Sequence, residues 1–336
     1  MECISTFDML KIGVGPSSSH TLGPWRAAQR FLQELQQTHP ISSIKTIQTE
    51  LYGSLSLTGK GHATDFAVML GLSGEDPVTM QVEAIGTIID GIKQSHKLSL
   101  LGKHPIPYFP TENIIFLKTS LPFHANGIKF SAIFQDNTSY EETFYSIGGG
   151  FVVTEDRVNA KENIQVFKTF PFPTNSGRIL LEHCISENKS ISEIVLENEL
   201  SLRTHTEINT QLQAIWGTML ECMHLGCHTQ GTLPGGLNVH RRAFDIHEKL
   251  IGNFSYSSPQ EWLETIRKTE VKFRQILKWV SCFALSVNEV NASLGRVVTA
   301  PTNGSAGVIP AVLMYYLVIE NHSADFKYIQ KFLLVA

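Results

Sequence analysis

The pattern of apolar residues changes near residue 160, and this change limits the fold more than any other feature of the sequence. Before that point helical and strand-like segments alternate, with a helical face at Ala28, Phe31, Leu32 and Leu35. Strand-like runs cover 43–51, 113–118, 128–135 and 142–154. Helical patterns cover 63–72 and 85–92. After it the patterns are helical almost throughout. We therefore predict an α/β domain over 1–158, followed by a mostly α-helical domain over 165–336.

Four helical signals support the second half of this prediction. Ser190-x-x-Glu193 has the form of a capping box, and a long apolar stripe from Leu212 to Met223 indicates one helix that ends near residue 227. Ser258 and Pro259 announce a further helix, which we expect to run to about residue 290. An apolar helix is expected from Val308 to Ile319.

Composition excludes several classes of function. The 336 residues are 42% hydrophobic, enough for a large core and about two domains. A net charge of −4 without a basic block argues against nucleic acid as a partner. The longest apolar run, 306–319, is shorter than a membrane span requires and contains Pro310. With no secretory signal visible in residues 1–20, we expect a cytoplasmic protein whose five cysteines are thiols.

A polar cluster precedes the first predicted helix. Ser17, Ser18, Ser19, His20 and Thr21 lie between two Gly-Pro pairs, directly before the segment that begins at Trp25. One serine at such a position is commonly a helix cap. Capping needs only one side chain, however, so five polar side chains favour a ligand site.

A glycine-rich segment follows the strand-like run 43–51. Gly59 and Gly61 flank Lys60 and His62, and a helical pattern begins shortly after, at Ala63. His62 is a candidate general acid or base because histidine titrates near the working pH. The alternative is a histidine whose ring merely caps the turn.

A third polar loop lies near the end of the chain. Thr302, Asn303, Gly304 and Ser305 stand between Pro301 and the apolar helix that begins near Val308. Small residues let a ligand approach the backbone, and the first turn of the helix leaves N–H groups without internal partners. This arrangement suits a small anion, although a plain tight connection would have the same composition.

Two further groups of residues leave alternatives open. His224 and His228 are spaced i, i+4 and lie beside Cys222 and Cys227, so a metal site is one interpretation. The five-residue spacing turns the two cysteines to different helix faces, which favours a buried core instead. The adjacent Arg241 and Arg242 could bind a carboxylate, or could lie in solvent at a helix start.

Taken together, these motifs resemble the iron–sulfur-dependent L-serine dehydratase (L-serine ammonia-lyase) family over essentially the whole chain. The matching segments are 11–21, 59–65, 233–236 with 241–243, and 298–304. The resemblance implies an N-terminal domain similar to the allosteric substrate-binding domain of a phosphoglycerate dehydrogenase, and a helical catalytic domain. It also implies a lyase of amino-acid catabolism and gluconeogenesis that converts L-serine to pyruvate and ammonia, with a homodimer as the expected assembly.

The resemblance further implies a [4Fe–4S] cluster held by three cysteines, with one iron open to the substrate. None of Cys3, Cys184, Cys222, Cys227 and Cys282 matches a ligand position, because the family's ligand cysteines follow the helix expected after Lys327. We therefore expect no metal ligands here, and a chain that is C-terminally incomplete and unable to hold the cluster.

The implied chemistry needs a grip on the substrate carboxylate, a base for the α-proton and a Lewis acid for the leaving hydroxide. His62 is the expected base. The expected substrate-binding residues are Ser17, Ser18, Ser19, His20, Thr21, Lys60, Thr64, Thr302, Asn303, Gly304 and Ser305. Two alternatives stay open: a pyridoxal-phosphate dehydratase with Lys60 as the Schiff-base lysine, and a non-catalytic serine-binding fragment.

Overall fold

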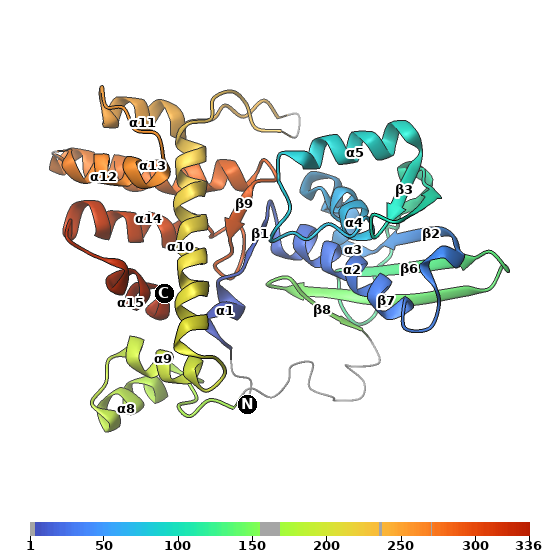
Figure 1. The fold of residues 1–336 in the computed structure, drawn as a ribbon, viewed down its shortest axis with the longest axis horizontal. Helices are drawn as coiled ribbons and strands as arrows, with labels where there is room; N and C mark the ends of the chain where they lie inside the picture. Colours follow the sequence, from blue (N-terminus) through green and yellow to red (C-terminus); the bar gives the residue numbers. More distant parts are fainter. Residues whose placement is uncertain (1–3, 155–168, 235–236, 270) are drawn as a thin grey trace. The chain divides into compact units, whose positions relative to one another are not determined.

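The chain divides into two compact units. A computed structural model describes residues 4–154, 169–234, 237–269 and 271–336 (Figure 1). One unit is Gly13–Ile164, and the other combines Met1–Ile12 with Gln165–Ala336. Residues 4–12 thus pack with the C-terminal half of the chain.

The α/β unit is built on a mixed five-stranded sheet. Its strand order is β5-β2-β6-β7-β8, in which β2 and β5 are parallel and the other neighbouring pairs are antiparallel. A separate hairpin joins β3 to β4. The strands are β1 (Ile12–Val14), β2 (Ile44–Leu51), β3 (Lys97–Leu100), β4 (His104–Pro107), β5 (Ile114–Phe116), β6 (Gly127–Phe134), β7 (Ser139–Gly148) and β8 (Phe151–Thr154).

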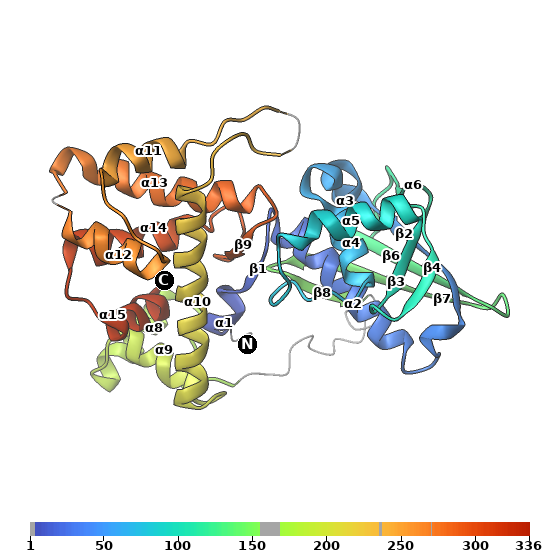
Figure 2. The same ribbon diagram turned by 45° about the horizontal axis from the view of Figure 1, so that its top comes forward.

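Helix α2 (Gly23–Leu35) packs on this sheet against β6, β7 and β8, and α4 (Thr64–Leu72) packs on α2. The rings of Phe31 in α2 and Phe130 in β6 stack at 5.0 Å, because alternate residues of β6 point into the core. A side chain at Gly71 would lie 2.5 Å from the Trp25 carbonyl oxygen, so glycine lets α4 approach α2 closely. The remaining helices are α3 (Gly53–Thr58), α5 (Ala84–Ser95) and α6 (Pro110–Asn113) (Figure 2).

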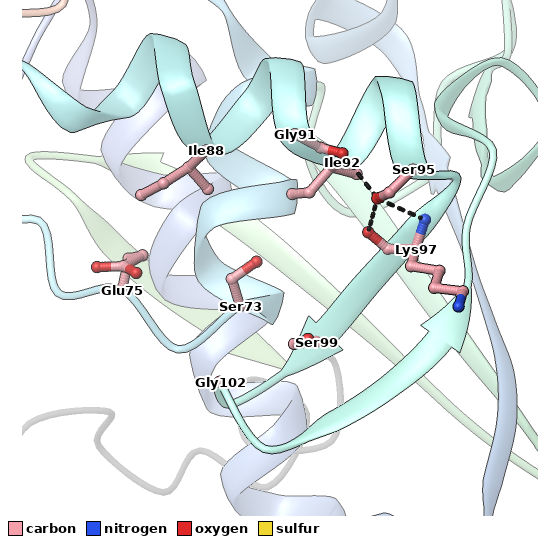
Figure 3. Close-up of a pocket in the computed structure, with 9 residues that line it drawn as sticks. All are labelled: Ser73, Glu75, Ile88, Gly91, Ile92, Ser95, Lys97, Ser99 and Gly102. Atoms are coloured by element: carbon pink, nitrogen blue, oxygen red, sulfur yellow. Dashed lines mark hydrogen bonds between the residues drawn. The ribbon is translucent and has the colours of Figure 1, made fainter.

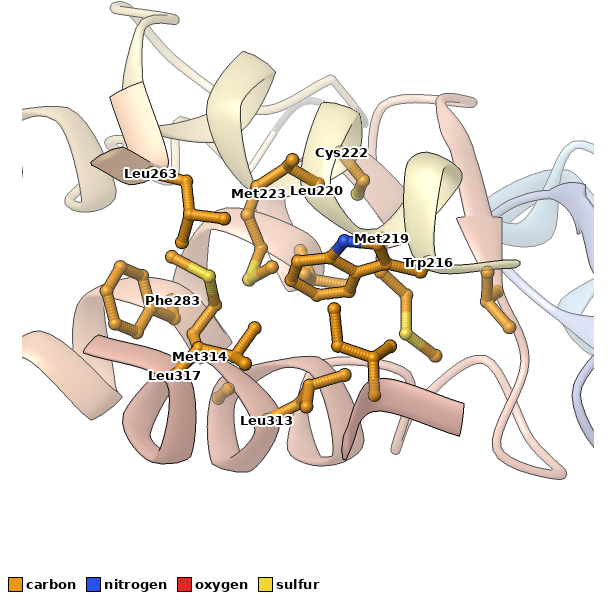
Figure 4. Close-up of a cluster of buried hydrophobic side chains, with 14 of the residues drawn as sticks. Trp216, Met219, Leu220, Cys222, Met223, Leu263, Phe283, Leu313, Met314 and Leu317 are labelled. Atoms are coloured by element: carbon orange, nitrogen blue, oxygen red, sulfur yellow. The ribbon is translucent and has the colours of Figure 1, made fainter. Parts of the chain in front are cut away.

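The second unit is helical, with the long helix α10 (His205–Cys227) beside most of the others. Apolar residues of α10, α12, α13 and α14 meet in its core, where Trp216, Met223, Phe283 and Leu313 are buried (Figure 4). The elements are α1 (Thr6–Met9), α8 (Gly177–Glu187), α9 (Ile191–Leu200), α10, α11 (Ala243–Ile251), α12 (Pro259–Lys268), α13 (Phe273–Asn291), β9 (Arg296–Val298), α14 (Val308–Tyr315), a π-helical turn (Tyr316–Glu320) and α15 (Phe326–Val335).

Buried polar contacts hold the N-terminal segment to this unit. The Glu199 carboxylate, 1% exposed, accepts hydrogen bonds from the Ser5 hydroxyl at 2.9 Å and the Thr6 amide at 2.7 Å, and pairs with Arg203 at 2.6 Å. Farther along, the Thr299 amide donates to the Lys11 carbonyl at 2.8 Å. A carboxylate with this many partners is well satisfied although buried, which explains why residues 4–12 pack with the helical unit.

The predicted α/β domain followed by a mostly helical domain is confirmed. Two boundaries were wrong, however. The run 142–154 is two strands, because Gly148, Gly149 and Gly150 all take positive φ and turn the chain. The single helix expected from Ser258 to residue 290 is also two helices.

That second division lies between Lys268 and Phe273. Thr269 is already extended at the end of α12, and α13 begins with its own cap, since the Lys272 amide donates to the Gln275 side chain at 3.0 Å. Within the four described ranges, no helix is both long and apolar enough to cross a membrane.

Candidate functional site

The polar segment before α2 folds into a capped π-helical turn, Ser18–Leu22. Ser17 is its cap, because the Ser17 hydroxyl oxygen accepts a hydrogen bond from the His20 amide at 3.2 Å. The Ser19 hydroxyl lies 2.8 Å from His20 Nδ1 and 3.4 Å from the Ser17 hydroxyl. Capping therefore accounts for one serine of the cluster, and a second serine contacts the histidine ring.

His62 ends a 3-10 turn, Gly59–His62, and lies next to His20. The two imidazole rings are tilted, with their centroids 4.9 Å apart. His62 Nδ1 lies 2.9 Å from the Thr58 carbonyl oxygen, which can only accept, so Nδ1 carries the proton of the neutral ring. Nε2 of neutral His62 is then the nitrogen with a lone pair, and it is able to accept a proton.

Two buried threonines link the backbones of these histidines. The Thr21 hydroxyl donates to the His62 carbonyl at 2.7 Å, and the Thr64 hydroxyl donates to the His20 carbonyl at 2.6 Å. Thr21 is 1% exposed and Thr64 is fully buried. The structure therefore gives both threonines a role in holding the histidine pair, while their predicted contact with the substrate stays a prediction.

Burial lowers the pKa of His20 below its ordinary value, and the neighbouring His62 lowers it further. His20 is accordingly neutral near pH 7. Its second ring nitrogen, Nε2, lies 2.8 Å from the hydroxyl of Ser54, a residue that the motif analysis did not select.

Lys60 is exposed, and its Nζ lies 5.5 Å from the centre of the Phe116 ring. The structure thus brings Ser17, Ser19, His20, Thr21, His62 and Thr64 together, and Ser18 is buried in the same turn.

The predicted anion loop belongs to the helical unit, where it connects β9 to α14. The Ser305 hydroxyl lies 2.5 Å from the Ala300 carbonyl and 2.9 Å from the Thr302 hydroxyl, so both hydroxyls stabilise the loop itself. Gly304 is exposed, and a side chain added there would meet nothing within 4 Å. An open glycine leaves its backbone accessible to a small ligand.

Asn303 is the buried residue of this loop. It is 2% exposed, and its amide nitrogen donates to the side-chain oxygen of Asn291 at 2.9 Å. The Asn303 side-chain oxygen, also buried, has no hydrogen-bond partner among the described residues. Buried polar atoms are normally satisfied, so this oxygen keeps the capacity to accept a hydrogen bond.

The two adjacent arginines lie in different surroundings, which decides between the alternatives left open for them. Arg241 is 8% exposed, and its guanidinium donates to the Ser293 hydroxyl at 2.5 Å. Arg242 is exposed, and its backbone amide donates to the buried Glu289 carboxylate at 2.7 Å. A solvated helix start thus describes Arg242 and not Arg241.

A surface groove of about 390 Å³ on the α/β unit is a separate feature (Figure 3). It lies between α5 and β3 and includes Glu75, Ser95 and Lys97. The Ser95 hydroxyl donates to the Gly91 carbonyl at 2.7 Å and accepts from the Lys97 amide at 3.3 Å, so it serves the local turn. None of the predicted site residues lines this groove.

Comparison with known proteins decides the family. A model of the serine dehydratase beta chain matches residues 5–157, and a model of the serine dehydratase alpha chain matches residues 186–336. The chain belongs to the serine dehydratase family. The expected family is therefore confirmed.

Three curated relatives within this family show how far the similarity extends. The chain is 40% identical over 325 residues to L-serine dehydratase 1 of Escherichia coli, covering 96% of this chain and 68% of that protein. It is 41% identical to L-serine dehydratase of Streptomyces coelicolor, covering 99% and 70%. For L-serine dehydratase of Haemophilus influenzae the values are 39%, 93% and 66%. The chain thus spans about two thirds of the length of these relatives.

The family resemblance implies an iron–sulfur cluster, whose protein ligands would be cysteine thiolates. Cys227 and Cys282 are fully buried, and their sulfurs lie 3.7 Å apart, a contact that the sequence did not indicate. Burial raises the pKa of Cys222 and also that of Cys227, where Cys282 raises it further. Cluster ligands are thiolates. These buried thiols, facing each other and the protein core, do not fit that ligand set.

His224 and His228 form an aromatic group with His247, Tyr256 and Trp262. The His224 and His228 rings stack at 4.1 Å, and His228 Nδ1 donates to the His224 carbonyl at 2.6 Å. Over the described residues, no three His, Cys, Asp or Glu side chains are grouped so that they could hold a metal ion. The metal interpretation of this segment therefore gains no support.

Proposed function

We propose that this chain takes part in the conversion of L-serine to pyruvate and ammonia, with His62 as the base that removes the α-proton. The observation that carries this proposal is the histidine pair, in which hydrogen bonding leaves His62 Nε2 as the proton acceptor. The names of the curated relatives support L-serine as the substrate.

The reaction balances without a further reactant. The α-proton moves from the substrate to His62 Nε2, the electron pair of that C–H bond forms the Cα=Cβ double bond, and the β-hydroxyl group leaves as water by taking the proton from the His62 imidazolium, which returns to its neutral form. The product is aminoacrylate, whose imine form reacts with water to give pyruvate and ammonia. His20 remains neutral beside the imidazolium that forms on His62, which avoids two positive charges 4.9 Å apart.

Substrate binding is assigned to polar groups that can still form a hydrogen bond or an ion pair. In the α/β unit these include the Lys60 ammonium, which is exposed and has no salt bridge among the described residues. Taken by itself, the helical unit offers a second set of candidates, the open backbone at Gly304 and the buried side-chain oxygen of Asn303. A cation such as Lys60 suits a carboxylate, whereas an acceptor oxygen such as that of Asn303 suits an ammonium group, so each unit separately offers a group of a kind that an amino acid presents.

The family resemblance also implies a [4Fe–4S] cluster that would activate the leaving hydroxyl. The buried thiols of Cys222, Cys227 and Cys282 do not fit such a cluster, and the proposed proton transfer at His62 does not involve one. The proposal includes a homodimer, which the family resemblance implies, and a cytoplasmic location, which is the expectation from the sequence.

The test combines turnover with binding. Pyruvate formation from L-serine is measured on the purified chain before and after anaerobic incubation with iron and sulfide, and serine binding is measured by calorimetry. Turnover that His62→Ala abolishes, while His322→Ala retains it, supports the proposal. His322 is a suitable control because it is exposed and lies in the helical unit. Serine binding without turnover under either condition would instead support a non-catalytic serine-binding protein.

A further inference from the structure

Ser54, a residue outside the recognised motifs, lies in a backbone segment that hydrogen bonds hold in place. It lies in the first turn of α3, where the Gly53 amide donates to the Thr119 carbonyl at 2.9 Å and the Ser54 amide donates to the Ala125 carbonyl at 2.8 Å. Gly53 has φ +52°, and a side chain there would lie 2.4 Å from the Ala125 carbonyl oxygen. The backbone beside Ser54 is therefore fixed from both sides.

From this position the Ser54 hydroxyl reaches His20 Nε2 at 2.8 Å. The other ring nitrogen of His20, Nδ1, lies 2.8 Å from the Ser19 hydroxyl. His20 is thus held by a hydroxyl at each nitrogen, whereas His62 has a hydrogen bond to a carbonyl at Nδ1 alone among the described contacts. The two neighbouring histidines are constrained to different degrees.

We propose that Ser54 is a positioning residue of this site: with Ser19 it holds the His20 ring in one orientation, and so leaves proton exchange with the substrate to His62. This inference rests on the proposed function for its catalytic consequence. The placement of His20 itself does not.

The hydrogen-bond chemistry supports this division of roles. A neutral imidazole has one N–H donor and one acceptor nitrogen, and a hydroxyl can complement either of them. Two hydroxyls at fixed positions therefore satisfy both nitrogens of a neutral ring, and turning the ring would break two hydrogen bonds at once. The Ser17 hydroxyl, 3.4 Å from that of Ser19, extends the network by one further group.

Hydrogen bonds to the backbone also support the positioning role of Ser54. The Thr64 hydroxyl fixes the His20 carbonyl and the Thr21 hydroxyl fixes the His62 carbonyl, so the two backbones are already held before the rings are considered. Ser54 adds the constraint that the backbone contacts lack, which is the orientation of the His20 ring towards His62.

The first experiment reads His20 directly and does not require turnover. The full chain is labelled with ¹⁵N at its histidine rings, and long-range ¹H–¹⁵N spectra are recorded near pH 7, with His20→Gln and His62→Gln spectra for assignment. We expect the His20 ring-nitrogen signals to move in Ser54→Ala, because one of the two hydrogen bonds to the ring is lost, and to return towards their original positions in Ser54→Thr. Ser56→Ala is the matched control, because Ser56 lies in the same helix and has no hydrogen bond among the described contacts. It should leave the spectrum unchanged.

The second experiment measures kcat and KM for L-serine in the same variants. Small misplacements of reacting groups can cost about a hundredfold in rate, so we expect Ser54→Ala to lower kcat by about tenfold to a hundredfold with KM changed less than about threefold. Ser54→Thr should recover most of the rate.

The outcomes separate this inference from the proposed function. Unchanged His20 signals in Ser54→Ala would show that Ser54 does not position the ring. Moved His20 signals with unchanged kcat would show that the position has no part in the reaction. If no preparation forms pyruvate, the proposed function fails, whereas the spectra still decide the role of Ser54 in placing His20.

Discussion

Two groups of histidines in this molecule look alike in the sequence and differ in their surroundings. His20 and His62 lie among serine and threonine hydroxyls, with two side-chain-to-backbone hydrogen bonds between their segments. His224, His228 and His247 lie among aromatic rings, and His247 is 2% exposed and accepts a hydrogen bond from the Trp262 indole at 2.8 Å. Serine and threonine hydroxyls surround the first group, whereas aromatic rings surround the second and supply hydrogen-bond partners from Tyr256 and Trp262.

The comparison teaches that the partners of a histidine say more about its role than its spacing does. The i, i+4 pair His224 and His228 matches a common metal-binding spacing, yet burial lowers the pKa of His224 and of His247 to about 4. Such rings stay neutral and act as flat, largely apolar side chains. His62, without a recognised spacing, keeps an accepting nitrogen near a second histidine.

The strongest test of this contrast replaces one histidine from each group. His62→Ala should lower kcat by about a hundredfold or more, as expected for a general base, and leave the melting temperature nearly unchanged. Turnover close to that of the unaltered chain would show that His62 is not the base.

His247→Ala should do the reverse. It leaves the buried Trp262 N–H without an acceptor, which costs about 1 to 3 kcal/mol of unfolding free energy, while kcat per folded molecule is retained. Urea denaturation followed by tryptophan fluorescence measures the loss. A stable variant with low kcat would place His247 in the reaction and remove the distinction between the groups.

The helical group also predicts how stability depends on pH. In the folded chain the pKa values of His224 and His247 are about 4, below their ordinary 6.5, so the unfolded chain binds more protons between these values. The free energy of unfolding should therefore be fully present above pH 6.5 and fall as the pH is lowered towards 4. Denaturation at pH 7.5, 6.5 and 5.5 measures this, and His224→Phe should make the decline shallower. An equal decline in that variant would assign the effect to other groups.

The sequence was sufficient for the fold class because apolar periodicity is a local property. The helices at 23–35, 64–72 and 205–227 and the strand at 127–134 all follow runs of regularly spaced apolar residues. The division between α12 and α13 escaped this reading, since both helices present apolar faces and only the extended Thr269 and the cap at Lys272 separate them.

The site could be predicted only in part, because its contacts join residues that are distant in the sequence. His20 and His62 stand in motifs, but their mutual contacts join residues 34 to 44 positions apart, and no local pattern reports such contacts. Ser54 was missed on that account, as was the contact between the Cys227 and Cys282 sulfurs. The different burial of Arg241 and Arg242 is likewise set by tertiary packing and not by their adjacent positions.

A smaller effect is expected from the threonine links. Thr64→Val keeps the shape of the side chain and removes the hydrogen bond to the His20 carbonyl, at a cost of about 1 kcal/mol. Because the link also holds His20 beside His62, kcat should fall as well, and the two effects are read from denaturation and steady-state kinetics on the same sample. Thr58→Val is the control: its hydroxyl bonds the Ser54 carbonyl on an exposed face, so it should change kcat less. Equal losses of kcat would assign the effect to general loosening of the unit.

The smallest expected effect separates capping from ligand binding. Ser17 and Ser258 are both helix caps, with hydroxyl oxygens that accept from backbone amides at 3.2 Å, one in each unit. Replacing either by alanine should cost about 1 kcal/mol of stability, the usual value of such a cap. Only Ser17 also lies within 3.4 Å of the Ser19 hydroxyl that contacts His20. We therefore expect Ser17→Ala to weaken L-serine binding in calorimetry, while Ser258→Ala lowers the melting temperature without changing affinity. Equal affinities in the two variants would reduce Ser17 to a cap, and the polar cluster before α2 would lose one of its predicted substrate contacts.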